Sequence, residues 1–463
     1  MRQKLSVTLI FLAGVCFATF VSLLPYLLDS NRIRKSQYVS GNPLLSTTAN
    51  VVARLGIFQW RPVYDNWDNF FPSDSPGIHE TALIRNTGHF VPKLNSANAD
   101  LKAEAVASFN LALEMKESGK IAKAKKLFNH ALNLDPLHAD ILYEYGWFLE
   151  EHQNDVLLAE HMYNRALTVS PDHQLARQKR KNVLPLVEEL DQKSFGRIDR
   201  KRDLLMKIPD SNLAFRRAKK EAYFQHIYHT TALEGNTMNL MQTRYIVETR
   251  MAIAGKSILE HNEILGMDAA LSFINNTLLN RIGRISMADI LDIHVRVLGA
   301  VEPTEAGKLR ATQVYVGGFA PPEPIQLVPL MSEFLEWLNS AEAMSLHPIE
   351  FAARAHYRLV YIHPFVDGNG RTSRLLMNLV LMQAGYPPVV VRVEDRLEYY
   401  ETLEKANHGD LRPFVRFIAR CTEQTVDTFL RAITEHNVSA LEIASVDDGR
   451  TIIMEGGEVD RED

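Results

Sequence analysis

The sequence predicts an all-α fold, and three observations support this prediction. Residues 101–172 carry a repeated helical pattern, and the charged residues 173–215 favour a helix throughout. A third stretch, residues 372–383 (TSRLLMNLVLMQ), is largely apolar and contains no helix breaker. Only residues 312–319 (TQVYVGGF) alternate briefly like a strand, which predicts a single small β-hairpin within a helical protein.

The chain has 463 residues, enough for about three domains, and its 46% hydrophobic content is sufficient for ordinary buried cores. The net charge of -5 gives no reason to expect a nucleic-acid partner. We divide the chain into a membrane anchor (1–30), a stalk (31–100), two helical repeats (101–172), a helical linker (173–215), a main domain (216–435) and an acidic tail (436–463).

Residues 5–28 form an almost purely apolar run without a charged residue. At about 1.5 Å per residue, a helix of this length crosses a hydrocarbon core of about 30 Å. We predict a membrane anchor, with a cleaved signal peptide as the alternative because Ala18 and Ser22 resemble small residues before a cleavage site. Basic residues lie on both sides of the run, so the charge rule does not decide its orientation.

Two glycosylation sequons, at Asn275 and Asn437, permit a lumenal location for the main domain. The two cysteines are Cys16, inside the predicted anchor, and Cys421. No disulfide can therefore form within the soluble part of the chain.

The repeat is defined by small residues, an aromatic residue and a proline at matching positions. Ala112, Ala124, Phe128, Ala131 and Pro136 recur 34 or 35 residues later as Gly146, Ala159, Tyr163, Ala166 and Pro171. This pattern resembles two tetratricopeptide repeats, with a generic helical hairpin as the alternative. Two repeats are too few for an independent stack, so we expect them to pack on the linker that follows, where Pro185 kinks one helix or separates two.

The stretch with the densest chemistry is residues 363–374 (HPFVDGNGRTSR). Pro364 and the glycines of residues 368–370 disfavour a helix there, so we predict a loop that leads into a helix from Thr372. The start of such a helix presents free backbone amides and positive dipole charge, which suit phosphate oxygens.

Side chains of this stretch suggest a reaction. Arg371 and Arg374 are three residues apart, so both can face an anion, and Asp367 can hold Mg²⁺ between itself and phosphate. His363 has a reference pKa near neutrality and can take a proton from a hydroxyl. The alternative, a transition-metal site at His363 and Asp367, lacks a third ligand at suitable spacing.

This stretch resembles the Fic motif, HxFx(D/E)GNGRxxR, of enzymes that transfer AMP from ATP to protein hydroxyls, and every fixed position is filled. The resemblance implies that His363 is the general base and that Asp367 holds Mg²⁺, or Mn²⁺ in its place. It also implies that Asn369, the glycine amides and both arginines bind the triphosphate.

A second segment, TTALEGNTM, places Glu234 where Gly235 would end a helix. An isolated anion there is unfavourable, so we expect a positive partner. The segment resembles the inhibitory motif (S/T)xxxE(G/N) of some Fic enzymes, which implies that Glu234 pairs with Arg374 and keeps it from the γ-phosphate of ATP. We also expect Glu234 to orient water when AMP is removed, with His363 as the acid.

Residues 312–319 correspond to the Fic flap, which by resemblance holds an extended target segment opposite His363. The resemblance further assigns a nucleoside pocket to the segment that follows residue 396. The complete set of expected nucleotide-binding residues is Val316, Gly317, Gly318, Phe319, Asp367, Gly368, Asn369, Gly370, Arg371, Thr372, Ser373, Arg374, Tyr399, Tyr400 and Asn407.

The order of segments resembles the metazoan, membrane-anchored FICD (HYPE) type of Fic enzyme. That resemblance implies a single-pass type II protein of the endoplasmic reticulum membrane, with its catalytic body in the lumen. It implies AMPylation and deAMPylation of the lumenal Hsp70 chaperone BiP, and a homodimer with Ile258 near the contact. The alternatives are a membrane-anchored adaptor whose Fic fold only binds nucleotide, which would not need His363 and Asp367, and a relative that transfers another phosphate-containing group.

Overall fold

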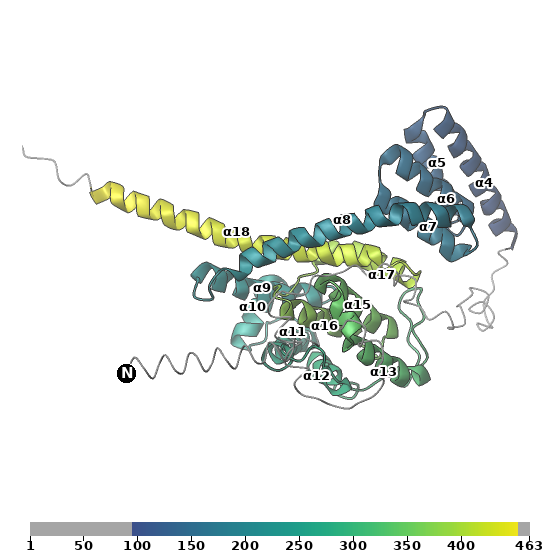
Figure 1. Cartoon of the computed structure of the whole chain (residues 1–463). Helices are drawn as coiled ribbons and strands as arrows, with labels where there is room; N and C mark the ends of the chain where they lie inside the picture. The colour runs from purple at the N-terminus through teal and green to yellow at the C-terminus, as the bar shows by residue number, and fades with distance from the viewer. Residues whose placement is uncertain (1–94, 452–463) are drawn as a thin grey trace, which may run out of the picture. The chain divides into compact units, whose positions relative to one another are not determined.

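The computed structural model describes residues 95–451, and the side chains of residues 100–434. The predicted membrane anchor (1–30) and residues 31–94 of the predicted stalk lie outside this range, as do residues 452–463 of the tail. Across residues 95–451 the regular structure is helical, and β-structure is limited to one antiparallel bridge between Val316 and Phe319 (Figure 1). None of the helices described combines the length and apolar character needed to cross a membrane.

The helical repeats form two helix pairs. Their helices are α4 (Asn95–Glu117), α5 (Ile121–Leu134), α6 (Ala139–Phe148), the π-helical turn η2 (Leu149–Gln153) and α7 (Val156–Val169). Gly119 adopts a left-handed conformation in the turn between α4 and α5, and the Asp155 carboxylate accepts a hydrogen bond of 3.1 Å from the Leu158 amide at the start of α7. Helix α4 begins within the range predicted as stalk.

The small and aromatic residues of the repeat pattern form the core of these helix pairs. Phe128 is fully buried, with its ring centroid 5.4 Å from Tyr145 and 5.2 Å from Phe148. A side chain at Gly146 would place its Cβ 2.8 Å from Tyr163, so only glycine permits this helix crossing. The predicted helices and their buried face are therefore observed, whereas their assignment as tetratricopeptide repeats stays a prediction.

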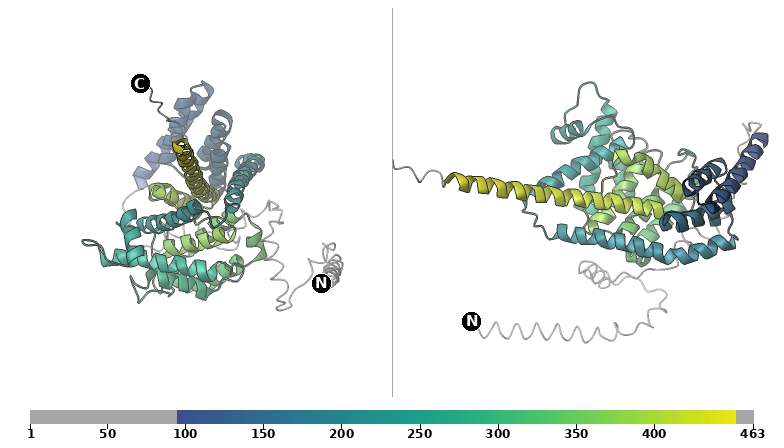
Figure 2. Two further views of the ribbon diagram at one scale, coloured as in Figure 1. Left: turned by 90° about the vertical axis from the view of Figure 1, so that its left-hand side faces the viewer. Right: turned by 90° about the horizontal axis from the view of Figure 1, so that it is seen from above.

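The linker is one helix, α8 (Gln174–Met206), with Pro185 inside it, so the alternative of two separate helices is not observed. Helix α8 runs beside α18 (Arg412–Thr451), as two views show (Figures 1 and 2). Ion pairs connect the two helices, with Arg416 2.7 Å from Asp191 and Lys201 2.8 Å from Glu423. Residues 436–451, predicted as tail, continue α18.

The main domain is a group of helices around α16 (Asn369–Gln383), whose Leu375, Leu376, Leu379 and Leu381 are fully buried. Its other helical elements before α16 are α9 (Leu213–Ala232), α10 (Leu240–Thr249), α11 (Ile258–Phe273), η3 (Ile274–Leu278), α12 (Met287–Leu298), η4 (Pro324–Gln326), α13 (Leu327–Leu338), α14 (Ala341–Ser345) and α15 (Pro348–Ile362). After α16 come η5 (Val393–Asp395) and α17 (Arg396–Asn407).

Helix α16 begins earlier than predicted. Gly368 is its N-cap residue with φ of 76°, and Asn369 and Gly370, which the sequence predicts to lie in the loop, belong to the first helical turn. Glycine at position 368 adopts the left-handed conformation that this sharp change in chain direction requires, so the helix begins at Asn369 and not at Thr372. The Fic-like loop is therefore confined to residues 363–368, between α15 and α16.

Candidate active site

His363 is the residue at which α15 ends. Its backbone is left-handed, with φ of 50°, and its ring Nδ1 lies 3.1 Å from the Val360 carbonyl oxygen. A carbonyl only accepts hydrogen bonds, so Nδ1 carries the proton and Nε2 keeps a lone pair. Burial lowers the pKa of His363, as does the nearby Arg310 cation, although the Val360 carbonyl, Glu234 and Asp367 act in the opposite direction. These conditions favour the neutral ring, the form that a general base requires.

Asn369 shapes the loop that follows His363. Its side-chain oxygen accepts from the Phe365 amide at 3.0 Å, and its side-chain nitrogen donates to the Phe365 carbonyl at 2.9 Å. Both polar ends are thus used within the protein, and the side chain is buried. The Asn369 side chain therefore holds the loop, and its contact with the triphosphate stays a prediction.

His294 on α12 supports the same loop from the other side, and sequence reasoning had missed it. Its ring stacks on Phe365 with centroids 3.7 Å apart, Nδ1 accepts from the Gly307 amide, and Nε2 donates to the Asp367 carbonyl at 2.9 Å. A Cβ at Gly368 would lie 3.2 Å from this Nε2, so the glycine also leaves room for His294. The loop is therefore held on both faces before any ligand binds.

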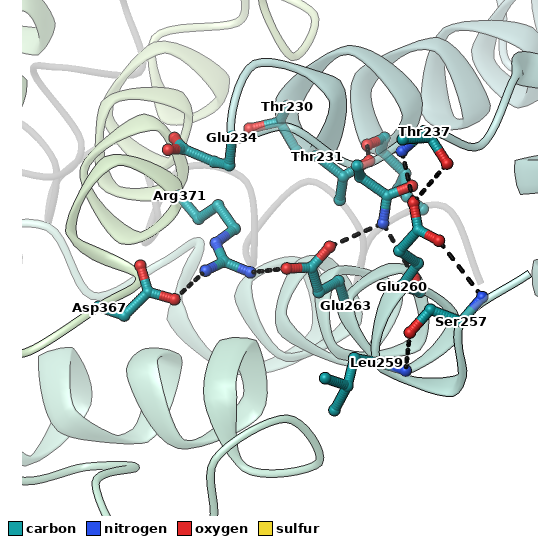
Figure 3. Close-up of polar contacts among 12 residues, drawn as sticks. Thr230, Thr231, Glu234, Thr237, Ser257, Leu259, Glu260, Glu263, Asp367 and Arg371 are labelled. Carbon is teal, nitrogen blue, oxygen red and sulfur yellow. Dashed lines mark hydrogen bonds and ion pairs between the residues drawn. The ribbon is translucent and has the colours of Figure 1, made fainter.

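Arg371 is almost completely buried and joins two carboxylates (Figure 3). Its Nη2 lies 2.7 Å from Asp367 and its Nη1 lies 3.3 Å from Glu263 on α11. Glu263 in turn accepts a 2.7 Å hydrogen bond from the Asn236 side chain. The Asp367 side chain is 57% exposed, so its carboxylate remains open on the solvent side.

Arg374 is held by the segment that precedes it by about 140 residues. Its Nε donates to the Thr230 hydroxyl at 2.7 Å and its Nη2 donates to the Thr230 carbonyl at 3.0 Å. The same Nη2 makes an ion pair with Glu234. Burial disfavours the cation, but Glu234 and Tyr399 together raise the pKa of Arg374 above its usual range, so it stays charged.

Glu234 lies directly against the start of α16. A Cβ placed on Gly370 would be 2.5 Å from the Glu234 Oε1 atom, so this carboxylate occupies the space over the first turn of the helix. Helix α9 ends at Ala232, and Glu234 follows in the turn after it. An anion at the C-terminal end of α9 is therefore stabilised by the N-terminal end of α16 and by Arg374.

The two residues after Arg371, Thr372 and Ser373, carry hydroxyl groups that are not used in hydrogen bonds among the described residues. Thr372 and Ser373 are fully buried, and within the described residues their hydroxyls have no hydrogen-bond partner, nor has the Arg371 Nε. Spare donors beside a helix N-terminus fit a phosphate-bearing ligand. The exposed Asp367 carboxylate beside them fits a divalent cation of the Mg²⁺ type.

The expected nucleoside-pocket residues divide into three positions. Tyr399 is buried, where its hydroxyl accepts from Arg374 Nη1 at 3.3 Å and donates to His356 Nε2 at 2.9 Å. Tyr400 is 41% exposed beside it, and Asn407 accepts a 3.2 Å hydrogen bond from Tyr357. Tyr400 is the most exposed of the three and Asn407 is partly exposed, whereas the Tyr399 hydroxyl supports Arg374.

The predicted flap hairpin is present only as a single turn. The Val316 and Phe319 backbones exchange hydrogen bonds of 2.9 and 3.0 Å around Gly317, whose φ is 58°. Gly318 completes the turn, and the Phe319 ring lies 5.2 Å from Tyr361 on α15. The three prolines that follow prevent longer strands, as expected.

Comparison with known proteins agrees with this geometry. A model of the Fic/DOC family matches residues 284–381, from the segment before α12 to the body of α16. The chain is 56% identical over 352 residues to "Protein adenylyltransferase Fic" of Aedes aegypti, covering 76% of this chain and 70% of the relative. This chain belongs to the Fic family of protein adenylyltransferases.

Further relatives of the Fic adenylyltransferase extend the match beyond the family model. The Nematostella vectensis protein of the same name is 54% identical over 363 residues, covering 78% of this chain and 84% of that protein. A solved fragment of Fic-1 from C. elegans is 43% identical, with a TM-score of 0.67 over 72% of this chain and 99% of the fragment. ATP is accordingly the nucleotide substrate of this Fic enzyme, which transfers AMP to protein.

Proposed function

We propose that this adenylyltransferase both adds AMP to and removes AMP from hydroxyls of the Hsp70 chaperone BiP, and that Glu234 restrains the addition. The observation that carries the proposal is the position of Glu234, which pairs with Arg374 and lies against Gly370 at the start of α16. A carboxylate there occupies the space over the first turn of α16 and pairs with the arginine that the terminal phosphate of ATP would need.

The transfer step follows from the neutral His363 ring. Its Nε2 accepts the proton of a serine or threonine hydroxyl on the target, the hydroxyl oxygen attacks the α-phosphorus of ATP, and pyrophosphate leaves. Arg371 and the amides of the first turn of α16 stabilise the negative charge on the phosphates. Mg²⁺ or Mn²⁺, held by Asp367, would supply further positive charge when bound.

Restraint by Glu234 acts on alignment of the nucleotide. As long as the Glu234 carboxylate pairs with Arg374, this arginine cannot bind the γ-phosphate of ATP. ATP that binds in this state keeps its triphosphate displaced, and the α-phosphorus is not placed in line with the target hydroxyl.

Removal of AMP uses the same two residues in different roles. Glu234 lies beside the anion site and can orient a water molecule toward the phosphorus of the AMP–protein bond. In this direction His363 must carry a proton on Nε2 as well, and it donates this proton to the departing hydroxyl oxygen while Glu234 takes a proton from the attacking water. The carboxylate that hinders transfer is therefore the group that removal requires.

The cellular setting is part of the proposal. We infer a single-pass type II protein of the endoplasmic reticulum membrane, anchored by residues 1–30, with its catalytic body in the lumen and a homodimer contact at Ile258. Asn275 is exposed in η3 and Ile258 is 63% exposed at the start of α11, which supports a glycan at the first and a partner at the second. Asn437 lies in α18.

The decisive experiment measures both directions with wild type and Glu234→Gly. Incorporation from α-labelled ATP into purified Hsp70 should rise sharply in the variant, while release of AMP from pre-modified Hsp70 should be lost. Glu234→Gln, which keeps the side-chain size and removes the charge, should show weaker changes in the same directions. Unchanged transfer in Glu234→Gly would refute the restraint, and absence of transfer in every variant would favour the adaptor alternative.

Location is tested separately in cells. At least one of the two sequons should carry a glycan, seen as a mobility shift that endoglycosidase removes and that Asn275→Gln or Asn437→Gln reduces. Digestion of the catalytic body by protease added to intact microsomes would overturn the lumenal placement.

A further inference from the structure

Arg310 is a buried cation without a carboxylate partner in the described part of the chain. Its exposed fraction is 2%, and its guanidinium is surrounded by main-chain carbonyl groups. A buried charge is costly unless its donors are used, and such an arrangement is rare unless it fixes something in place. The carbonyls that it binds show what is fixed.

The Arg310 side chain joins the catalytic loop to both ends of the flap. Its Nε donates to the His363 carbonyl at 2.8 Å, its Nη1 donates to the Thr312 carbonyl at 3.0 Å, and its Nη2 donates to the Pro322 carbonyl at 2.5 Å. Its backbone amide also donates to the Pro364 carbonyl at 2.9 Å. One residue thus contacts the backbone of the proposed base and, at Thr312 and Pro322, both ends of the flap segment.

A second residue closes the flap without reaching the catalytic loop. The Gln313 side-chain amide donates to the Pro321 carbonyl at 2.8 Å and to the Val314 carbonyl at 3.2 Å. These contacts stay within the flap. Gln313 therefore serves as an internal comparison, because its removal loosens the flap and leaves the link to His363 in place.

We propose that Arg310 is a positioning residue that sets the distance between a target hydroxyl held at the flap and the Nε2 atom of His363. The role rests on the proposed transfer to a protein hydroxyl at this flap. It requires the planar fork of arginine, because three carbonyls in three directions cannot all be reached from the single ammonium group of lysine. A displacement of about 1 Å between reacting groups costs about 10²-fold in rate.

The charge of Arg310 has a separate effect on the base. Arg310 helps to lower the pKa of His363, while Glu234 and Asp367 oppose it, and burial is the largest cause of the lowering. Replacing the cation with a neutral side chain removes one lowering influence, so the pKa of His363 should rise. Lysine keeps the charge and should leave this pKa nearly unchanged.

The first test compares Arg310→Lys and Arg310→Gln, each made in both the wild-type and the Glu234→Gly backgrounds. Both variants should lower AMP transfer to the target protein by about 10²-fold, while the affinity for ATP changes by less than about threefold. Hydrolysis of ATP to AMP and pyrophosphate without a target protein, which needs no segment held at the flap, should fall much less. The acid limb of the pH profile should move to higher pH only in Arg310→Gln, because only this variant loses the cation.

Arg358→Gln is the matched control, since Arg358 lies on α15, the helix that ends just before His363, and its guanidinium stacks over the Trp337 ring at 4.0 Å. It should leave transfer within about threefold of its parent. If Arg310→Lys lowered ATP binding, ATP hydrolysis without a target and AMP transfer to the target protein equally, the role of Arg310 would be merely structural and the proposal would be overturned.

A second measurement is independent of catalysis, so it separates failure of this inference from failure of the proposed function. Backbone hydrogen exchange should accelerate in Arg310→Lys both at residues 314–320 and at residues 363–368, whereas Gln313→Ala should accelerate exchange only at the flap. Acceleration at one segment alone in Arg310→Lys, or at neither, would show that Arg310 does not join them.

Discussion

The helical repeats and the surroundings of α16 bury their large side chains in opposite ways. In α4–α7 the buried bulk is aromatic, as with Phe128, Phe148 and Tyr163. Around α16 two of the largest fully buried side chains are Arg371 and Arg374, which bond to carboxylates, a hydroxyl and a carbonyl of other segments, although the Arg371 Nε has no partner among the described residues. Both regions are well packed, but only the second places charge where a ligand could compete for it.

Stability and activity therefore depend on different regions of this protein. Aromatic packing contributes free energy of folding in proportion to the apolar area that it removes from water. A buried ion pair contributes little net stability, because desolvation offsets much of the attraction. Changes in the repeats should therefore act on unfolding, and changes near α16 should act on the reaction.

The largest expected effect is on the reaction side of this comparison. His363→Ala removes the proposed base and should lower AMP transfer by about 10²- to 10⁴-fold. Within the described residues the His363 ring hydrogen-bonds to the Val360 carbonyl and does not hold the phosphate-binding side chains, so ATP affinity should remain close to wild type. Initial transfer rates and nucleotide titrations, both made in the Glu234→Gly background, check this; a rate like that of the parent would remove His363 from the mechanism.

The converse change lies in the repeats. Phe128→Ala leaves a cavity among the rings of Tyr145 and Phe148 and should lower the free energy of unfolding of this region by about 3–5 kcal/mol. ATP affinity should not change, because Phe128 packs within the core of the helical repeats. Denaturant unfolding and nucleotide titration of the same sample measure the two quantities. Loss of ATP binding under conditions where the main domain stays folded would contradict the separation of the two regions.

Acid should act on the main domain through His226. Burial lowers the pKa of His226 to about 4, although the Val389 carbonyl acts against the shift. The unfolded chain then binds more protons than the folded one between about pH 6.5 and pH 4, so the contribution of the neutral ring is complete above pH 6.5 and is lost as pH falls toward 4. The loss amounts to at most about 3 kcal/mol. Thermal unfolding across this range should show a smaller pH dependence in His226→Gln than in wild type.

The sharpest comparison uses the same substitution in both regions. Gly146→Ala forces a methyl group against the Tyr163 ring and should cost about 1–3 kcal/mol of unfolding free energy without changing ATP affinity. Gly370→Ala meets the end of the Glu234 side chain, which can move, so stability should change by less than about 1 kcal/mol. The new methyl group nevertheless lies over the anion site and should weaken ATP binding. Equal effects of the two variants on stability and on binding would contradict the separation of roles.

Sequence patterns predicted the parts of the fold that depend on local order. The 34-residue repeat located the buried residues of α4–α7, and the motif at residues 363–374 located the loop and the buried helix. The pairing of Glu234 with Arg374 was expected from a family motif, and the contact is present. The start of α16 was placed three residues late, because the left-handed backbone of Gly368 lets the helix begin at once.

The residues missed by sequence reasoning act over long separations and belong to no motif. His294 lies on α12, Glu263 lies on α11, and Arg310 lies in an irregular segment. Their roles arise only when the fold brings them to residues 363–371. Tyr399 shows the same limit, since its place beside Arg374 depends on how α17 packs against α18 and α15.

The left-handed backbone at His363 places activity and stability in direct conflict. A side chain with φ of 50° costs about 1–2 kcal/mol relative to a relaxed conformation, and glycine alone is free of this penalty. Selection for folding by itself would therefore favour glycine at this position, and the enzyme keeps histidine at a thermodynamic disadvantage. An inactive His363→Gly protein would remain well folded, with a vacated space into which added imidazole could enter and restore proton transfer.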